Sequence, residues 1–429
     1  MNLFNKELVI LPLGLDGTGQ PVAPAPGDIL TRTIPVDPSC DGDGVTLPSA
    51  DDLRPFALKF FDGKVYVGAV CSGQSMLQNL ITPPLTITDV NPIRANMRAY
   101  VYEFDPATNT FNSTPILSFT LDYPRQQVND LFPTRTENDG EWLPWSDEWR
   151  PDYAPYRPGV PNDEPIANPQ PMLVDIEFDR LGFMTLGFRD RFGDQAYFFR
   201  DPGPNDELPL YNGRQGGYLL LACLDSAGNW QLEGSGSCTN GLTSETRTAV
   251  ILSPDSGPAS STTPTVFNEF YHMDLWEEFH DETALGALAL LPGSGELVFS
   301  KYDSRSTFEN GTWIIDNTTG GPDDVDVGDR VAAVSQRVAI YGSRERFGKG
   351  AGMGDVELLL EAAPLELGNR VWFDEDRDGI QDPGDPPLSG VEVVLLLGGT
   401  PVATATTDAG GNYYFIGSNH PNAGTVGDN

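Results

Sequence analysis

Short segments of alternating hydrophobic and polar residues dominate the chain, and long segments with helical spacing are scarce. Such a pattern, bounded by turn residues, is typical of an all-β protein. F-A-L-K-F-F is followed by Asp62-Gly63 and then by K-V-Y-V-G-A-V-C. Asp-Gly readily adopts the positive φ angles of a two-residue hairpin turn, so this segment predicts a hairpin. The same pattern predicts hairpins at Met172–Asp190, with a turn at Leu181-Gly182, and at Ala287–Asp303.

Each predicted hairpin is followed by a further strand, and the arrangement returns about every 115 residues. These strands are R-A-Y-V-Y-E-F-D (Arg98–Asp105), Y-L-L-L-A-C-L-D (Tyr218–Asp225) and R-V-A-I-Y-G (Arg337–Gly342). The first two run into the turns D-P-A-T-N-T-F and D-S-A-G-N-W, which predict a fourth strand. Antiparallel units repeated in this way favour a propeller-like body, and a large β-sandwich is the alternative.

The hydrophobic pattern changes near Glu361, where E-A-A-P-L-E-L-G-N connects the repeats to an aspartate-rich segment. We therefore predict a boundary at about 364, with a propeller-like domain at 1–364 and a second β domain at 365–429. A chain of 429 residues is also too long for one ordinary core. The end at G-T-V-G-D-N is abrupt, and we expect the chain to be an excerpt.

The segment D-E-D-R-D-G-I-Q-D-P-G-D at 374–385 has the layout of a calcium-binding loop. Aspartates stand at its first, third, fifth, ninth and twelfth positions, and Gly379 at the sixth permits a sharp bend. Calcium takes six to eight oxygen ligands at about 2.3–2.6 Å, so converging carboxylates suit it. A solvated acidic turn is the alternative. The predicted Ca²⁺ ligands are Asp374, Asp376, Asp378, the carbonyl of Ile380, Asp382 and Asp385.

This region resembles the B domain of serine-aspartate-repeat surface proteins, which is related to the collagen-adhesin B-type sandwich. The resemblance rests on G-N-R-V-W-F-D-E-D-R-D-G-I-Q-D, P-L-S-G-V-E-V-V-L-L and T-T-D-A-G-G-N-Y-Y-F. It implies a calcium-stiffened sandwich that acts as a stalk, and it places Asp408 in a family turn. The match covers Leu367–Phe415, so we expect a C-terminally truncated sandwich. Some relatives carry a lysine–asparagine crosslink, which the absence of lysine after Lys349 excludes here.

The body also resembles a known group of sequences. H-D-E-T-A-L-G-A-L-A-L-L-P-G-S-G-E-L-V, G-T-W-I-I-D-N-T-T-G and R-F-G-K-G-A-G-M-G-D-V-E-L-L are similar to the large region that precedes such B domains in some bacterial surface proteins. That resemblance implies a location without implying an activity.

Charge and cysteine content narrow the class of protein. The chain has 62 acidic and 26 basic residues, a formal charge of -36, which excludes general attraction to nucleic acid and disfavours anionic membranes. Two interpretations fit this charge: a solvated, self-repelling surface that keeps the protein soluble, or bound divalent cations that neutralise part of it. No apolar run is long enough to span a bilayer. The simplest disulfide pairing joins Cys40 to Cys71 and Cys223 to Cys238, which favours an extracellular setting.

An aromatic, proline-rich segment, E-W-L-P-W-S-D-E-W-R-P-D-Y-A-P-Y-R at 141–157, is a candidate ligand-binding loop. Its rings would stack on a glycan or anchor a surface protein of a host or neighbouring cell. The alternative is that they pack the loop onto the body. The candidate residues are Trp142, Trp145, Trp149, Tyr153 and Tyr156.

Other motifs favour structural roles. G-F-R-D-R-F-G-D-Q at 187–195 is echoed by G-S-R-E-R-F-G-K-G at 342–350, and repetition favours an ion-pair turn over a carboxylate-binding site. His272 and His280 lack the spacing of a zinc motif, and no G-x-S-x-G elbow is present. We therefore expect no enzyme but a calcium-binding structural or adhesive protein of the bacterial cell surface. The alternative is a secreted propeller hydrolase that cleaves polysaccharide with paired carboxylates.

Overall fold

The structure is a computed structural model, in which the chain divides into two compact units, Met1–Leu358 and Leu359–Asn429. We call them the body and the C-terminal unit and describe each by itself. The predicted boundary at 364 falls in a segment outside the described residues. The structure describes residues 1–16, 20–40, 52–79, 87–125, 128, 140–146, 166–179, 181–195, 213–249, 269–271, 283–290, 295–302, 309–321, 337–342, 354–358, 367–375, 377, 384–397, 400–416 and 423–425.

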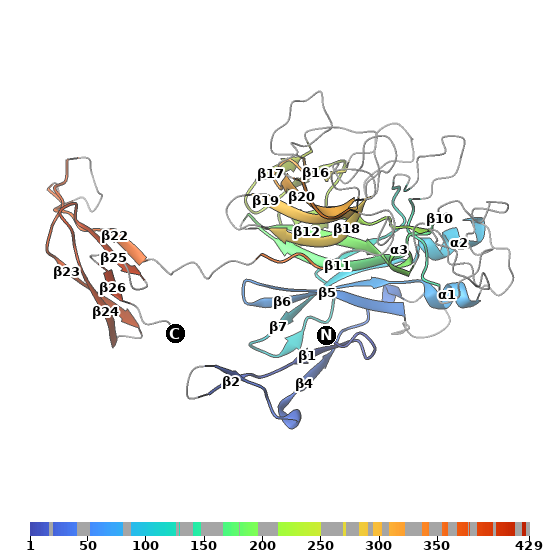
Figure 1. The fold of residues 1–429 in the computed structure, drawn as a ribbon, viewed down its shortest axis with the longest axis horizontal. Coiled ribbons are helices and arrows are strands. Elements are labelled where there is room, and N and C mark those ends of the chain that lie inside the picture. Colours follow the sequence, from blue (N-terminus) through green and yellow to red (C-terminus); the bar gives the residue numbers. More distant parts are fainter. Residues whose placement is uncertain are drawn as a thin grey trace. The chain divides into compact units, whose positions relative to one another are not determined.

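Three antiparallel sheets of the same strand order make up most of the body (Figure 1). In each, a hairpin is followed by a third strand that pairs with the second and by an outer strand that pairs with the third. The first sheet contains β5 (Leu53–Phe61), β6 (Lys64–Cys71), β7 (Arg98–Asp105), β8 (Thr110–Phe111) and β9 (Leu117–Thr120). The second contains β11 (Pro171–Phe178), β12 (Phe183–Asp190), β14 (Tyr218–Leu224) and β15 (Trp230–Leu232). The third contains β18 (Ala284–Leu290), β19 (Glu296–Tyr302), β20 (Glu309–Asp316) and β21 (Arg337–Gly342).

The three predicted hairpins are present, and the described turn residues of the first two have the expected backbone conformation. The turn of the third hairpin, at 291–294, lies outside the described residues. Asp62 and Gly63 have φ angles of 45° and 75°, as a primed two-residue turn requires, and Gly182 has φ 80°. One detail of the repeat prediction is wrong. The segment R-V-A-I-Y-G is β21, the fourth strand of its sheet, because β20 lies between it and the hairpin.

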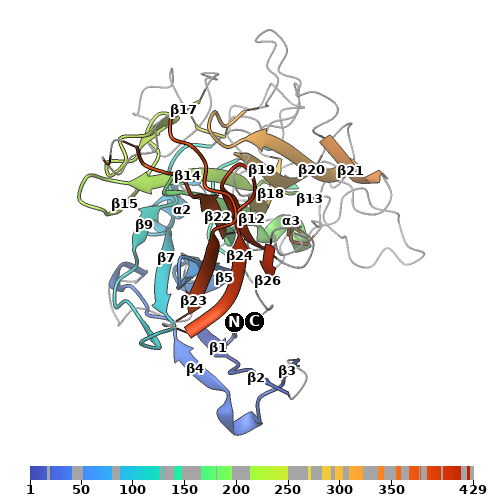
Figure 2. The ribbon, with the colours of Figure 1, turned by 90° about the vertical axis from the view of Figure 1, so that its left-hand side faces the viewer.

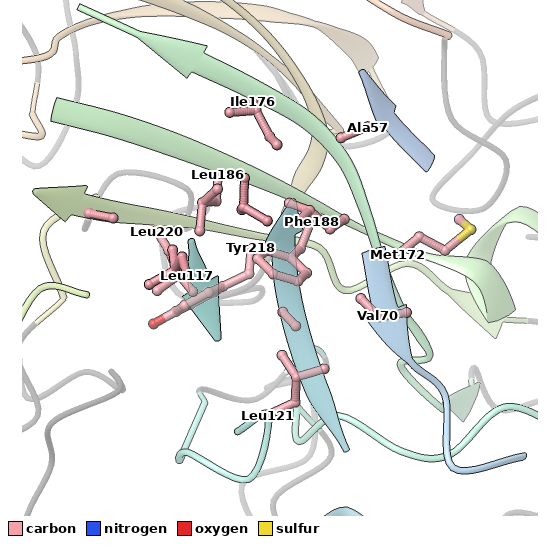
Figure 3. Close-up of a cluster of buried hydrophobic side chains, with 14 of the residues drawn as sticks. Ala57, Val70, Leu117, Leu121, Met172, Ile176, Leu186, Phe188, Tyr218 and Leu220 are labelled. Atoms are coloured by element: carbon pink, nitrogen blue, oxygen red, sulfur yellow. The ribbon is translucent and has the colours of Figure 1, made fainter. Parts of the chain in front are cut away.

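The sheets pack face to face, because the strands of the second sheet are apolar on both sides. Met184, Leu186 and Phe188 of β12 point into a cluster shared with the first sheet, whereas Phe183 belongs to a cluster shared with the third. Figure 3 shows Leu186, Phe188 and Leu220 gathered with Leu117 of the first sheet. The chain is therefore all-β, as predicted. The radial arrangement of a propeller stays a prediction.

The second and third sheets touch backbone to backbone at a pair of glycines. A Cβ atom at Gly187 of β12 would lie 2.0 Å from the carbonyl oxygen of Gly286 in β18. Gly286 has φ 81° and lies in a stretch where β18 shifts register against β19. No larger side chain fits at Gly187 unless the two sheets separate.

Replacing Gly187 with alanine is therefore expected to lower the free energy of unfolding by about 2 kcal/mol, because overpacking displaces backbone atoms. Urea unfolding measures this loss. Gly27→Ala is the control, because a Cβ atom there would meet nothing within 4 Å and the φ angle of Gly27 is not positive. Equal losses in the two variants would contradict the close contact.

The described residues 1–16 and 20–33, which we call the N-terminal arm, form a long bent hairpin. Figures 1 and 2 both show it beyond the first sheet. In it, β1 pairs with β4 and β2 pairs with β3. Its elements are β1 (Glu7–Ile10), β2 (Gly14–Leu15), β3 (Pro21–Val22), a 3-10 turn (Pro26–Asp28) and β4 (Leu30–Thr33).

Both predicted disulfides are confirmed, and each fastens a covering segment to a sheet. Cys40, in a 3-10 turn at Pro38–Cys40, is bonded to Cys71 at the end of β6. Cys223 of β14 is bonded to Cys238 of β16. The remaining short elements are α1 (Gln74–Asn79), α2 (Ile87–Arg94), α3 (Arg191–Gln195), β10 (Ile166–Ala167), β13 (Gly213–Arg214), β16 (Ser237–Thr239) and β17 (Thr246–Thr248). No helix of the described residues is long and apolar enough to cross a bilayer.

The C-terminal unit contains two small sheets, visible in red in Figure 2. In the first, β25 pairs antiparallel with β22 and parallel with β26. The second is the hairpin of β23 and β24. Among the described residues of the C-terminal unit, the buried apolar side chains are those of Ala405 in β24 and Phe415 in β25. The bounds are β22 (Leu367–Arg370), β23 (Glu392–Leu397), β24 (Thr400–Thr406), β25 (Asn412–Ile416) and β26 (Ala423–Thr425).

Candidate calcium-binding loop and the other predicted sites

The two ends of the aspartate loop lie side by side. Trp372 forms a β-bridge with Pro387, and the backbone N–H of Phe373 donates to the carbonyl oxygen of Pro386 at 2.9 Å. One step further out, the N–H of Leu388 donates to Val371 at 3.0 Å. The segment 374–385 thus begins and ends at two paired backbone segments. This placement explains how a loop of this kind fits between strands rather than helices.

The first and last aspartates of the loop face its backbone at this closed mouth. Asp374 Oδ1 accepts the N–H of Arg377 at 2.6 Å, and Arg377 has φ 63°, so the chain begins to curl within four residues. Asp385 is only 9 % exposed, and its Oδ1 lies 3.4 Å from the backbone nitrogen of Glu375 on the opposite end. A nearly buried carboxylate on one end and a second carboxylate on the other are hard oxygen donors of the kind that calcium takes.

The other four predicted ligands, Asp376, Asp378, Ile380 and Asp382, lie outside the described residues. Within the described part of the chain, no three acidic, histidine or cysteine side chains are grouped so as to hold a metal. The set of six ligands therefore stays a prediction, with two members placed at the loop mouth. Asp408 has a different role, because its Oδ1 accepts the N–H groups of Gly410 and Asn412 at 2.8 Å each and closes the turn into β25.

Two of the five predicted ligand-binding aromatic residues are buried in the body. Trp142 is 0 % exposed and donates its indole N–H to the hydroxyl of Tyr123 at 3.1 Å. Trp145 is 6 % exposed and donates to the carbonyl oxygen of Pro171 at 2.9 Å. These two rings are not open to a ligand from solvent, so the packing alternative describes them. Trp149, Tyr153 and Tyr156 lie outside the described residues.

The arginine turn after β12 forms internal contacts. The guanidinium of Arg189 donates to Asp194 at 2.6 Å. Arg191 donates to the side-chain oxygen of Gln170 at 2.6 Å and to the carbonyl oxygen of Ser146 at 2.9 Å. Both arginines thus have structural partners, which supports the ion-pair alternative. The related stretch at 343–350 and both histidines, His272 and His280, lie outside the described residues.

Sequence reasoning missed three buried carboxyl groups of the body. Asp175 of β11 accepts the N–H of Leu288 at 2.7 Å and so joins the second sheet to the third. Asp190 accepts from Gln170 at 2.8 Å and from Gly216 at 3.2 Å. Burial raises the pKa of Asp175 to about 8, with a further contribution from the negative charges of nearby carboxylates, and that of Asp190 to about 7.

The third of these groups, Glu233, follows β15. It accepts the N–H of Leu221 at 2.9 Å and that of Phe270 at 2.6 Å. Burial raises the pKa of Glu233 to about 8. All three carboxyls are thus engaged by backbone N–H groups of neighbouring segments. Their partners are distant in sequence, and a chain with 62 acidic residues gives no local signal that selects these three.

A buried arginine was missed as well. Arg125 is 1 % exposed, and its guanidinium donates to the carbonyl oxygens of Gly140, Gly216 and Gly217 at 2.6, 3.0 and 2.7 Å. The same group lies 3.7 Å from the ring centre of Trp142. Arg125 therefore fixes the buried tryptophan and two loops at the end of the second sheet.

The similar proteins match different shares of this chain. Residues 365–422 match the SdrD B-like domain family. Colossin-A of Dictyostelium discoideum is 28 % identical over 378 residues, which is 86 % of this chain and 3 % of that protein. Serine-aspartate repeat-containing protein F of Staphylococcus epidermidis is 48 % identical over 52 residues, 12 % of this chain and 3 % of that protein. The fibrinogen-binding protein of the same species is 44 % identical over 65 residues, 15 % of this chain and 6 % of that protein.

The chain thus spans only a small part of each of these three relatives. No solved structure matches it. The aspartate loop, with its paired ends, and the Asp408 turn both lie within the matched range. Within the C-terminal unit, residues 365–422 are therefore similar to SdrD B-like domains.

Proposed function

We propose that the chain is part of an extracellular or cell-surface protein with a structural or adhesive role, in which Ca²⁺ bound at residues 374–385 stiffens the SdrD B-like domain. The observation that carries the proposal is the closed loop mouth, where Asp374 and Asp385 stand on paired backbone segments. The five-aspartate spacing supplies the remaining carboxylates.

The stiffening follows from electrostatics. Six carboxylates within twelve residues, those of Glu375 and the five aspartates, repel one another, and Arg377 is the one basic residue in the same segment. A divalent cation that takes oxygen ligands from both ends of the loop replaces this repulsion with attraction. Because the ligand set assembles only when the two ends are paired, binding of the cation is coupled to folding of the loop and its flanking strands.

Two further observations support an extracellular role. Both disulfides fit an oxidising environment. Relatives of the C-terminal unit include a fibrinogen-binding protein by name, so we propose that the partner of the whole protein is a surface protein or glycan of a host or neighbouring cell. We further propose that the body is not an enzyme. Of the carboxyls with strongly raised pKa values, Asp175, Asp190 and Glu233 are all buried against backbone N–H groups, which supports a structural rather than a catalytic role for these three.

Addition of Ca²⁺ to the full chain is expected to slow hydrogen exchange at residues 367–375 and 384–397, because the bound ion ties the loop ends together. Isothermal titration calorimetry should show binding that EDTA abolishes. The double variant Asp374→Asn, Asp385→Asn should weaken affinity at least about tenfold, since it removes two charged ligands at once.

Glu392→Gln is the matched control, because it removes a negative charge from the same unit at an exposed position on β23. It should bind Ca²⁺ as the unmodified chain does. Binding that is lost equally in both variants would indicate general charge attraction, and absence of any calcium effect on exchange would refute the proposal.

A further inference from the structure

The N-terminal arm exposes an unusual number of large apolar side chains. A two-stranded hairpin is at best marginally stable in water and depends on a surface against which it can bury apolar groups. Phe4 is 91 % exposed, and Leu13 is 59 % exposed. The exposed apolar residues of the arm are Leu3, Phe4, Leu11, Leu13, Val22, Ile29 and Leu30.

One edge of β1 is open beyond its first residue. The carbonyl of Lys6 accepts the N–H of Ile34, so residues 6, 8 and 10 bond toward β4. Glu7 turns the other way, because its N–H and carbonyl bond with Asn2 at 3.1 and 2.7 Å. By the same alternation, the N–H and carbonyl of Val9 point to the outer edge. Among the described residues, no strand pairs with that edge beyond the bridge at Asn2.

The charge of the arm indicates what covers this edge. Two basic residues, Lys6 and Arg32, stand among the first 35 against three acidic ones, Glu7, Asp16 and Asp28. The arm is therefore nearly neutral in a chain whose formal charge is -36. Surfaces outside the arm are acidic, so two copies of the chain that met through them would repel each other at close range. Two arms can approach without that penalty.

We propose that the N-terminal arm is a self-association site, in which β1 of one copy lies antiparallel to β1 of a second copy and the N–H and carbonyl of each Val9 bond to those of the other. The pairing is isologous, because each copy presents the same edge and the same apolar side chains. It joins two hairpins into a four-stranded sheet and covers part of the exposed Leu11 and Leu13. The acidic sheets of both copies stay on the far sides of the two arms.

Analytical ultracentrifugation of the full chain tests the proposal. We expect a reversible monomer–dimer equilibrium that strengthens several-fold when NaCl rises from about 0.05 to 0.5 M, because salt screens the repulsion between the bodies. If ion pairs between the two copies held the dimer together, association would instead weaken as the salt concentration rises. A chain that remains monomeric at every salt and protein concentration up to about 0.1 mM would overturn the proposal.

Val9→Pro is the decisive variant. Proline removes the outward N–H and blocks the outer edge, while β1 keeps its bonds to β4 through Leu8 and Ile10. Val9→Thr is the control, because it keeps the N–H and a β-branched side chain. Dimers should persist in Val9→Thr and be lost in Val9→Pro. Dimers that survive in Val9→Pro would place the interface elsewhere.

Hydrogen exchange of the unmodified chain gives a reading that does not depend on how Val9→Pro folds. The amide of Val9 should become more protected as protein concentration rises, whereas the amide of Leu8, already bonded toward β4, should change little. Protection of Val9 that is independent of concentration would mean that the arm is covered within one copy, and this also would refute the proposal.

Discussion

Lowering the pH from 8.5 to 5.5 is expected to raise the melting temperature of the body by roughly 5–10 °C. The effect comes from Asp175, Asp190 and Glu233, whose pKa values burial raises to about 8, 7 and 8. In the unfolded chain such groups lose their protons near pH 4. Between pH 4 and 8 the folded body therefore binds more protons than the unfolded chain, so its stability falls as the pH rises.

The size of the effect follows from the same shifts. Each pKa unit corresponds to about 1.4 kcal/mol for one group. The contribution of these groups is fully present below about pH 4, is lost progressively up to the raised pKa values, and changes no further above them. Together the three groups contribute several kcal/mol over this window.

Differential scanning calorimetry of the full chain in EDTA measures the dependence. The large negative charge of the chain also favours acidic pH, so a variant must separate the two causes. Asp175→Asn keeps the shape of the side chain but does not titrate. It is expected to melt lower at pH 5.5, because the amide has one acceptor oxygen where the carboxyl has two, and to show a smaller fall toward pH 8.5. An unchanged slope would mean that general repulsion alone sets the dependence.

The local parts of the fold follow from local sequence. Asp62-Gly63 determines its hairpin because few residue pairs adopt two positive φ angles at low cost. Asp408 closes its turn with N–H groups two and four residues ahead, so the T-D-A-G-G-N pattern is sufficient to predict it. The pairing of Cys40 with Cys71 is likewise predictable, because each cysteine flanks the same predicted hairpin.

Long-range contacts could not be predicted, because the local sequence around each partner does not distinguish it from similar residues. Asp175 accepts from an N–H 113 residues away, and the register shift that exposes this N–H in β18 has no sequence mark besides Gly286. Trp142 and Trp145 stand in a polar, proline-rich stretch that suggests an exposed loop. Both rings are buried because they pack against the second sheet, and Trp142 also lies against the guanidinium of Arg125. These partners come from other parts of the chain.

Replacing Arg125 with lysine is expected to lower the free energy of unfolding by about 3 kcal/mol. The guanidinium donates to three carbonyl oxygens, those of Gly140, Gly216 and Gly217, and covers the ring of Trp142. A lysine ammonium keeps the charge but lacks the planar fork that serves several acceptors at once. Buried carbonyls would then lose their donors, which costs more than the average hydrogen bond contributes.

Urea unfolding followed by tryptophan fluorescence measures this loss, since Trp142 lies directly against the substituted group. Arg32→Lys is the matched control, because Arg32 also donates to backbone carbonyls, those of Thr31 and Asn109, but does so near the surface. Its loss should stay below about 0.5 kcal/mol. Added salt should leave the difference between the two variants unchanged, because the contacts of Arg125 are buried and poorly screened. A loss for Arg125→Lys no larger than that of the control would show that the three carbonyls find other donors, and that the segments at the end of the second sheet are held by packing alone.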